Sequence, residues 1–263
     1  MSIVYKSHAE LQKMWTANQV VREVLSELAA MVKPGVTTGE LGDRAAALVR
    51  QHRVEPAFLG YGSPPFPAVV CVSVNDEVVH GIPNHKRVLV EGDIVSIDFG
   101  VARDGYFGDS ARTVPVGEIS AEAKKLLKVT EEALGRAIEQ CRPGNRLRDV
   151  SSAVQTHVEL NGFSVVRVFV GHGIGRRMHE DPPVPNFVGP GRNPRLRPGM
   201  VLAIEPMVNV GTHEVTVDED RWTARTKDGK LSAHFEHSVA ITENGPWVLS
   251  GASAETGVAL HTA

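Results

Sequence analysis

The N-terminal part of the chain contains two stretches in which apolar side chains recur at helical spacing. The first opens with a capping-box sequence at Ser7–Glu10 and stops at Lys33-Pro34-Gly35. A second capping-box sequence, at Thr37–Glu40, opens a stretch that reaches about His52. We therefore expect two consecutive helices here, separated by a short turn.

The middle of the chain repeats this arrangement of helix starts and stops. Ser120 opens a third helical stretch, and Arg142-Pro143-Gly144 ends it. A fourth stretch runs from about Leu147 to Leu160 and is closed by Asn161-Gly162. The common order of caps and Pro-Gly stops predicts a second helix pair related to the first.

Two strand-like segments also resemble each other. Residues 89–98 and 196–205 share a leucine, a glycine, a penultimate isoleucine and a closing acid, which is Asp98 in one and Glu205 in the other. Any two β-rich segments that follow a glycine share part of this pattern. Because the helix stops recur in the same order, we interpret the likeness as an internal duplication.

The duplication predicts the architecture. We expect one catalytic domain over residues 1–263, with related halves at approximately 1–115 and 116–250 and an α/β (α+β) fold. Two like halves that face each other would place Asp98 and Glu205 on opposite sides of a shared cleft.

A hairpin brings two aspartates together. Asp104-Gly105 is a strong two-residue turn signal between apolar runs, and counting outward from it pairs Gly100 with Asp109. Because strand side chains alternate, Asp98 shares a face with Gly100 and becomes a diagonal neighbour of Asp109, close enough to share a cation. The alternative is an acidic edge strand exposed to water, but the apolar neighbours on both strands favour burial.

Four acids and one histidine lie in apolar or glycine-rich surroundings. A carboxylate in such a place must be paired, protonated or bound to a cation, because an isolated buried charge is too costly. Four carboxylates would neutralise two divalent cations, and a neutral imidazole completes an oxygen-rich ligand set. The sequence therefore predicts a two-metal hydrolytic site. The five residues are Asp98, Asp109, His172, Glu205 and Glu236.

Three histidines lie beside glycine or in a glycine-rich stretch. The glycines on both sides of His172 allow close approach of the backbone to a ligand. A phosphate-binding loop is the competing interpretation, but residues 171–175 lack the Gly-Lys-Ser/Thr ending. For any one of His80, His172 and His179 a structural or surface role is the commoner one; for the three together we favour chemistry.

Composition narrows the class of protein. With 42% hydrophobic and 22% charged residues the chain is typical of a soluble globular protein, and a net charge of −3 gives no reason to expect a nucleic-acid partner. No apolar run approaches the roughly 20 residues of a membrane span, and the start lacks the apolar core of a signal peptide. Two cysteines make no disulfide framework, so we expect a cytoplasmic protein.

Short motifs spread over nearly the whole chain match one enzyme family. They are residues 75–83, 92–98, 104–109, 162–166, 171–175, 198–200, 204–208 and 236–237. In these stretches the chain resembles the methionine aminopeptidases, specifically their type I bacterial form. That family has the pita-bread fold, in which two pseudo-symmetric halves with an antiparallel curved sheet and outer helices enclose a dinuclear metal site.

The resemblance implies hydrolytic removal of the initiator methionine, with a preference for a small second residue, by a metal-activated water. It implies that Glu205 shuttles protons, that His179 hydrogen-bonds the substrate carbonyl or the oxyanion, and that His80 lies near the scissile nitrogen. It also implies two divalent cations (manganese, iron(II) or cobalt), of which Asp109 and Glu236 bridge both. The implied ligands are Asp98, Asp109, His172, Glu205 and Glu236.

The resemblance extends to the methionine pocket. Tyr61, Cys71 and Trp222 match pocket positions of the family. Phe58 stands where the family often has cysteine, and Met178 stands where it usually has phenylalanine.

Two further departures and one further site follow from the same likeness. The loop over residues 60–71 has an unusual spacing, in which Phe66 aligns with the aromatic residue of the pocket, and His234 replaces a residue that is commonly glutamine. The family's monovalent cation site, for sodium or potassium, is matched by Asn75, by Glu77 through its carbonyl, and by Ser232.

The implied partners are peptides with N-terminal methionine, ribosome-associated nascent chains among them, with no nucleic acid and no membrane; we expect a monomer. The first alternative is an Xaa-Pro aminopeptidase or dipeptidase of the same fold, which usually needs a large extra N-terminal domain. A type II methionine aminopeptidase would need a helical insertion, which the second half lacks. A non-catalytic binding relative would typically have lost metal ligands, and all five are present.

Overall fold

A computed structural model describes residues 2–252 of the chain. Its helices begin and end where the sequence predicts, because the signals that set their ends are local. The Ser7 and Thr37 side chains each accept a hydrogen bond from the backbone of the glutamate three residues on, and each glutamate bonds back to the cap. The helices are α1 (His8–Met31), α2 (Thr38–His52), α3 (Ala121–Glu139) and α4 (Leu147–Leu160).

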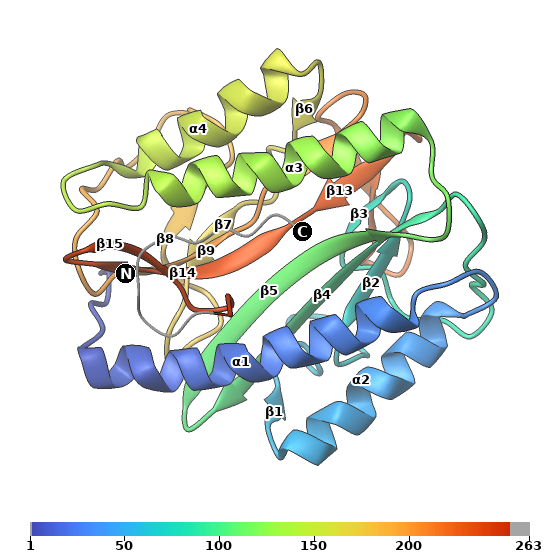
Figure 1. Ribbon diagram of the computed structural model, residues 1–263, viewed down its shortest axis with the longest axis horizontal. Coiled ribbons are helices and arrows are strands. Elements are labelled where there is room, and N and C mark those ends of the chain that lie inside the picture. Colours follow the sequence, from blue (N-terminus) through green and yellow to red (C-terminus); the bar gives the residue numbers. More distant parts are fainter. Residues whose placement is uncertain (1, 253–263) are drawn as a thin grey trace.

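A curved, antiparallel sheet forms the centre of the molecule (Figure 1). Its main path is β1 (Glu55–Pro56), β4 (Ile94–Arg103), β5 (Tyr106–Pro115), β14 (Glu236–Thr242), β9 (Val201–Ile204), β7 (Gly171–Gly173) and β8 (Glu180–Val184). β2 (Cys71–Val74) pairs with β4, and β15 (Gly245–Val248) pairs with β14.

Two smaller sheets, each of three strands, border the central one in the described residues. The first consists of β13 (Ser232–His234), β10 (Met207–Asn209) and β6 (Ser164–Val165). The second consists of β11 (Val215–Val217), β12 (Ala224–Thr226) and β3 (Glu77–Val79).

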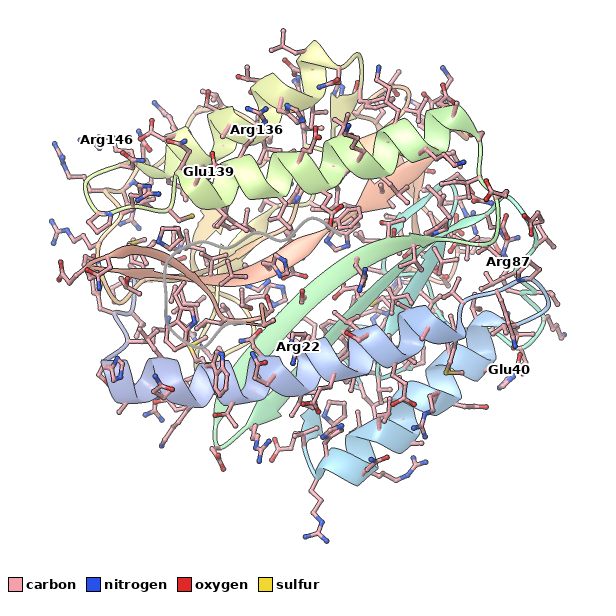
Figure 2. The ribbon with its side chains drawn as sticks, in the orientation of Figure 1. Arg22, Glu40, Arg87, Arg136, Glu139 and Arg146 are labelled. Atoms are coloured by element: carbon pink, nitrogen blue, oxygen red, sulfur yellow. The ribbon has the colours of Figure 1, made fainter. Side chains whose placement is uncertain are left out.

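The four helices cover one side of the sheet as two pairs (Figure 1). α1 and α2 bury their apolar faces with β2, β4 and β5 in one core cluster. α3 and α4 pack in a second cluster with β9 and β14. Charged side chains of these helices, such as the exposed Glu40, Arg136 and Glu139, point outward, and so does that of Arg146 at the N-cap of α4 (Figure 2). No helix in residues 2–252 combines the length and apolar character needed to cross a membrane.

Equivalent backbone hydrogen bonds recur in the two halves. In the first, the Gly35 amide donates to the Leu89 carbonyl at 2.8 Å; in the second, the Gly144 amide donates to the Leu196 carbonyl at 3.2 Å. The first bond joins the turn after α1 to the segment before β4, and the second joins the turn after α3 to the segment before β9. This equivalence supports the predicted duplication, whose boundaries at about 115 and 250 stay a prediction.

The predicted hairpin register is confirmed. Asp104 and Gly105 form the tip with positive φ of 52° and 75°, and Gly100 lies opposite Asp109. Asp98 lies opposite Ala111, two residues from Asp109 along the same face. The local turn signal was sufficient to set the positions of both aspartates.

Candidate active site

The acidic residues lie on the face of the sheet opposite to the helices. Ile97 and Phe99 of β4 are fully buried in the core under α1 and α2, so Asp98 between them points the other way. Val239 of β14 is buried against α3 and α4, and Glu236 therefore has the opposite orientation. Helix packing on one face thus sets the direction of the carboxylates on the other.

Strand register places these side chains in neighbouring rows. Ala111 of β5 lies opposite both Asp98 of β4 and Glu236 of β14, so the small alanine separates two acids on one face. On the other side of β14, His172 of β7 lies opposite Ala203 of β9. Acids from both halves of the sequence and the histidine therefore converge on one region.

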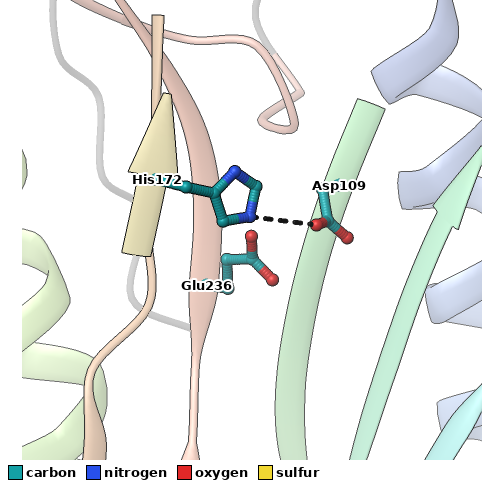
Figure 3. Close-up of side chains that lie close together, drawn as sticks. All are labelled: Asp109, His172 and Glu236. Atoms are coloured by element: carbon teal, nitrogen blue, oxygen red, sulfur yellow. Dashed lines mark ion pairs between the residues drawn. The ribbon is translucent and has the colours of Figure 1, made fainter. Parts of the chain in front are cut away.

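Three of the predicted metal ligands form a tight cluster (Figure 3). One candidate ligand atom from each of Asp109, His172 and Glu236 lies within 4.8 Å of the other two, and all three residues are buried. His172 Nε2 is 3.9 Å from Asp109 Oδ2 and 3.6 Å from Glu205 Oε1. Asp98 lies on the strand next to that of Asp109, and its charge acts on both Asp109 and Glu205. The structure therefore places all five residues in one region, with Asp98 and Glu205 outside the tight group of three.

The acids of this region favour protonation when no cation is present. Burial raises the pKa of Asp98 to about 7. Burial, and then the charges of Glu236 and Asp98, raises the pKa of Asp109 well above its usual range. Burial and neighbouring carboxylates likewise raise the pKa of Glu205 and of Glu236. Divalent cations would relieve both the desolvation and the mutual repulsion.

His172 is arranged to offer Nε2 to the cluster. Its Nδ1 lies 2.9 Å from the Gly173 carbonyl, which can only accept, so Nδ1 carries the hydrogen and Nε2 is left with a lone pair. Burial lowers the pKa of His172 to about 3, which keeps the ring neutral. A neutral imidazole with a fixed tautomer is the form that ligates metals.

Several buried polar atoms at the site have no hydrogen-bond partner among residues 2–252. They include one carboxylate oxygen each of Asp98, Asp109 and Glu236, and Nε2 of His234. Buried polar groups are normally satisfied, so this concentration of open acceptors calls for a ligand. Carboxylate oxygens with one imidazole nitrogen form a donor set that suits manganese, iron(II) or cobalt. The residues present therefore fit a divalent metal centre.

The glycines on both sides of His172 also have a structural reason that the sequence did not indicate. A Cβ on Gly171 would lie 2.3 Å from the Ala203 carbonyl oxygen, and a Cβ on Gly173 would lie 2.3 Å from the Asp181 carbonyl oxygen. The close approach is between neighbouring strands, so the glycines let β7 fit between β9 and β8 and so place His172.

Hydroxyl and amide side chains that sequence analysis missed hold the ligand strands in register. Ser238 Oγ donates to the Asp109 carbonyl at 2.8 Å, and Ser110 Oγ donates to the Glu236 carbonyl. Asn18 of α1 accepts a hydrogen bond from the Asp109 amide at 3.3 Å. The only available signal was a small polar residue inside an apolar strand or helix face.

Histidines and aromatic rings border the acidic cluster. The His179 ring lies 4.1 Å from that of His172, centroid to centroid, and Tyr61 Oη lies 2.7 Å from His179 Nδ1. His80 makes edge-on contacts with Trp222 at 5.8 Å and with Phe169 at 5.4 Å. Sequence analysis did not name Phe169, although it lies two residues before the glycine-framed histidine motif.

The loop over residues 60–71 packs on the same wall. Trp222 Nε1 donates to the Pro64 carbonyl at 3.1 Å, and Phe66 meets the Trp222 ring edge-on at 5.3 Å. Gly62 has positive φ, and a Cβ there would lie 2.5 Å from the indole. This contact holds the loop with its unusual spacing against Trp222.

The other predicted pocket residues lie around the same region. Cys71 of β2 is buried directly opposite Asp98 on β4, and burial with the neighbouring carboxylates raises the pKa of its thiol well above the usual range. Phe58 approaches Gly100, beside Asp109, since a Cβ on Gly100 would lie 3.1 Å from both side chains. Met178 is buried one residue before His179.

His234 is buried behind Glu205. Its Nε2 lies 4.0 Å from Glu205 Oε2, and Thr113 fixes its backbone by bonding to both its amide and its carbonyl at 2.9 Å. Burial lowers the pKa of His234 to about 3, so the ring is neutral. A neutral imidazole, rather than an amide, therefore faces the glutamate.

The residues suggested for a monovalent cation also lie together. The Ser232 amide donates to the Asn75 carbonyl at 2.8 Å. The Asn75 side chain is already committed, since it donates to Asp93 at 2.7 Å and accepts from the Ile94 amide at 3.0 Å. Each of the two Asn75 oxygens therefore accepts one hydrogen bond and keeps a second lone pair that a cation would use.

Comparison with known families decides the class. Residues 12–243 match the model of metallopeptidase family M24. The chain belongs to that family. Membership in the M24 family confirms the predicted pita-bread fold and the predicted metallopeptidase class.

Relatives within the M24 family match along nearly their whole length. The methionine aminopeptidase of Clostridium acetobutylicum is 51% identical over 248 residues, which cover 94% of this chain and 98% of that protein. The one from Escherichia coli is 42% identical over 252 residues, covering 95% and 94%. The crystal structure of methionine aminopeptidase from Thermotoga maritima has a TM-score of 0.91 at 46% identity, covering 95% of this chain and 99% of that one.

Proline-specific enzymes share the architecture. The prolidase from Pyrococcus furiosus has a TM-score of 0.75 at 21% identity and covers 95% of this chain but 66% of its own. At this identity the likeness shows a common fold only.

Proposed function

We propose that this M24 enzyme removes the N-terminal methionine from peptides and proteins by metal-dependent hydrolysis. The observation that carries the proposal is the buried cluster of Asp109, His172 and Glu236, with open carboxylate oxygens beside a neutral imidazole. The full-length likeness to methionine aminopeptidases supports the choice of substrate.

We infer two divalent cations, held by Asp98, Asp109, His172, Glu205 and Glu236. Four carboxylates would balance the charge of two such ions, and Asp109 and Glu236 belong to the tight group of candidate ligands. Manganese, iron(II) and cobalt all suit this donor set. When bound, the ions supply Lewis-acid activation of the scissile carbonyl and of a water.

Glu205 is the residue that we assign to proton transfer. Burial and the neighbouring carboxylates raise its pKa, and the side chain is 15% exposed at the edge of the cluster. A carboxyl group with these properties can take a proton from a water and return it to the departing amine. Nε2 of His234 lies 4.0 Å from Oε2 of this carboxyl group.

His179 and His80 bind the peptide in this proposal. In the tautomer in which Tyr61 Oη donates to His179 Nδ1, the other ring nitrogen carries the hydrogen and can donate to the substrate carbonyl as negative charge develops on it. His80 is neutral because burial lowers its pKa to about 4, and we assign it to the scissile nitrogen. Burial also lowers the pKa of His179, which favours the same neutral form.

The methionine side chain would occupy the apolar region beside the cluster. Phe66 packs edge-on against Trp222, Tyr61 lies against His179, and Cys71 lies opposite Asp98. Phe58 and Met178 complete the set that we assign to the pocket. Soft thioether and aromatic groups match a thioether substrate. A small second residue, such as Ala, Ser or Gly, is the expected preference.

Further features remain proposals that rest on the family likeness. They are a structural sodium or potassium ion at Asn75, Glu77 and Ser232, a monomeric state, a cytoplasmic location and action on nascent chains at the ribosome.

A peptide assay combined with metal analysis tests the proposal. Methionine release from Met-Ala-Ser should disappear on chelation and return with about two equivalents of manganese, cobalt or iron(II) per chain. Xaa-Pro peptides serve as the matched control for a proline-specific activity. Release of the first residue from Xaa-Pro but not from Met-Ala-Ser would overturn the assignment, as would full activity in metal-free protein.

A further inference from the structure

A buried ion pair joins the N-terminal segment to the loop that carries His179. Lys6 Nζ donates to Glu180 Oε2 at 2.7 Å, and each side chain is only 3% exposed. The Lys6 backbone is itself anchored, since its amide donates to the Gly199 carbonyl at 2.7 Å. Two residues far apart in the sequence are thus fixed to each other beside the site.

The Glu180 carboxylate organises the whole turn that precedes it. Its Oε1 accepts hydrogen bonds from the Arg176 amide at 2.9 Å and the Arg177 amide at 3.2 Å, while Oε2 is taken by Lys6. Gly175 gives the pair its space, because a Cβ there would lie 2.4 Å from Lys6 Cε and 2.8 Å from Glu180 Oε1. The ion pair between Lys6 and Glu180 therefore requires glycine at position 175, the last residue of the 171–175 motif.

His179 immediately precedes Glu180, and Glu180 is the first residue of β8. Successive side chains near a strand point to opposite sides, so a fixed Glu180 determines where His179 points. His179 faces the site, with Tyr61 at 2.7 Å and the His172 ring at 4.1 Å. Glu180 faces Lys6 on the other side.

The energetics of buried ion pairs argue against a purely stabilising role. Desolvation of two charges consumes most of their attraction, and apolar replacements are often as stable. What such a pair provides is a unique geometry, here for a turn that includes residues 175–180. We propose that Lys6 is a positioning residue that holds His179 in place by fixing Glu180. The proposal rests on the proposed function through the assigned role of His179.

A second contact from the same segment of the chain supports this interpretation. The Arg176 guanidinium lies over the Tyr106 ring at 4.7 Å and is 3.5 Å from Glu10, in the first turn of α1. The Phe107 amide also donates to the Gly175 carbonyl at 2.8 Å. The turn is therefore held on its outer side at three points.

The first test measures the turn directly in metal-free protein. In Lys6→Met, amide hydrogen exchange over residues 175–180 should be at least about tenfold faster than in the wild type, because Glu180 loses its partner. Lys124→Met is the matched control, since it removes the lysine of an exposed pair with Glu118 at 3.0 Å. Exchange in that variant should equal that of the wild type.

The second test asks whether Lys6 acts through His179. With saturating manganese and Met-Ala-Ser, Lys6→Met should lower kcat about 10- to 100-fold with little change in KM or metal content. In a His179→Ala background the same change should have no further effect on kcat, because the group that it positions is gone. A structural role would lower activity equally in both backgrounds.

The outcomes separate this inference from the proposed function. Equal exchange and equal kcat in Lys6→Met and Lys124→Met would overturn the inference, as would additive losses with His179→Ala or a parallel loss of metal. If Lys6→Met does not fold, Lys6→Met/Glu180→Gln leaves no charge uncompensated and is tested in the same way, with an expected loss in kcat of about tenfold. A wild-type enzyme that does not release methionine would instead refute the proposed function.

Discussion

The metal-free enzyme should lose stability as the pH rises, and Asp98 provides the clearest test. Burial places the pKa of Asp98 at about 7 in the folded chain, against 3.8 for the ordinary group. Between these two values the folded state holds a proton that the unfolded chain has released. The free energy of unfolding therefore falls as pH rises through this interval, and the loss is complete above about pH 7.

The size of the effect follows from the two pKa values. Their difference corresponds to about 4 kcal/mol, of which about 2 kcal/mol falls between roughly pH 5.5 and 7.5. Asp98→Asn removes the ionisation and keeps the shape of the side chain. The free energy of unfolding of the variant, minus that of the wild type, should therefore rise by about 2 kcal/mol over that interval.

Urea unfolding of chelated protein at several pH values measures this difference. Buried histidines such as His172, whose pKa falls to about 3, act in the opposite direction, but they are common to both proteins and cancel in the subtraction. Manganese should reverse the ranking, because the wild type gains binding energy that the variant lacks. A difference that stays constant with pH would refute the claim that Asp98 is a desolvated carboxyl group in the metal-free fold.

Three other changes test separate parts of the site. Glu205→Gln should reduce methionine release by at least about 100-fold while circular dichroism and the unfolding midpoint change little, since it removes the proton carrier but not a core contact; a normal rate would exclude that role. His179→Ala should reduce kcat by about 100-fold with metal content unchanged, because it removes one donor to the substrate oxygen; a matching loss of metal would indicate ligation instead. Gly173→Ala should cost about 1–3 kcal/mol of stability and disturb metal binding, because its Cβ would meet the Asp181 carbonyl at 2.3 Å; calorimetry of the chelated protein should detect the loss, and an unchanged midpoint would contradict it.

The parts of the fold that sequence predicts well depend on neighbours in the chain. Capping boxes and Pro-Gly stops gave the four helices, and the Asp104-Gly105 turn gave the register that sets Asp98 beside Asp109. In each case the decisive hydrogen bonds join residues a few positions apart. The four acids and the histidine were recognisable because a charged residue inside an apolar run is costly.

The parts that sequence could not predict depend on distant pairings. No local pattern in the sequence predicts that β14 lies between β5 and β9, although this strand order brings Glu236 next to Asp109. The partner of Glu180 is Lys6, in a segment with no strand or helix of its own. The glycines around His172 stand out in the sequence, but only the structure shows that the neighbouring backbones on both sides of β7 leave no room for a side chain there.

Burial connects the stability of this enzyme to its chemistry. The apolar strands that fix the carboxylates are packed from behind by two helix pairs, so the acids cannot move apart to relieve their repulsion. In the metal-free chain this rigidity is a cost, which appears as the raised pKa values of Asp98, Asp109, Glu205 and Glu236. With cations bound, the same rigidity becomes preorganisation, because the ligands need no rearrangement to surround the charge. The buried carboxylates therefore lower the stability of the metal-free fold, and the packing of the helices on the opposite face of the sheet offsets this loss.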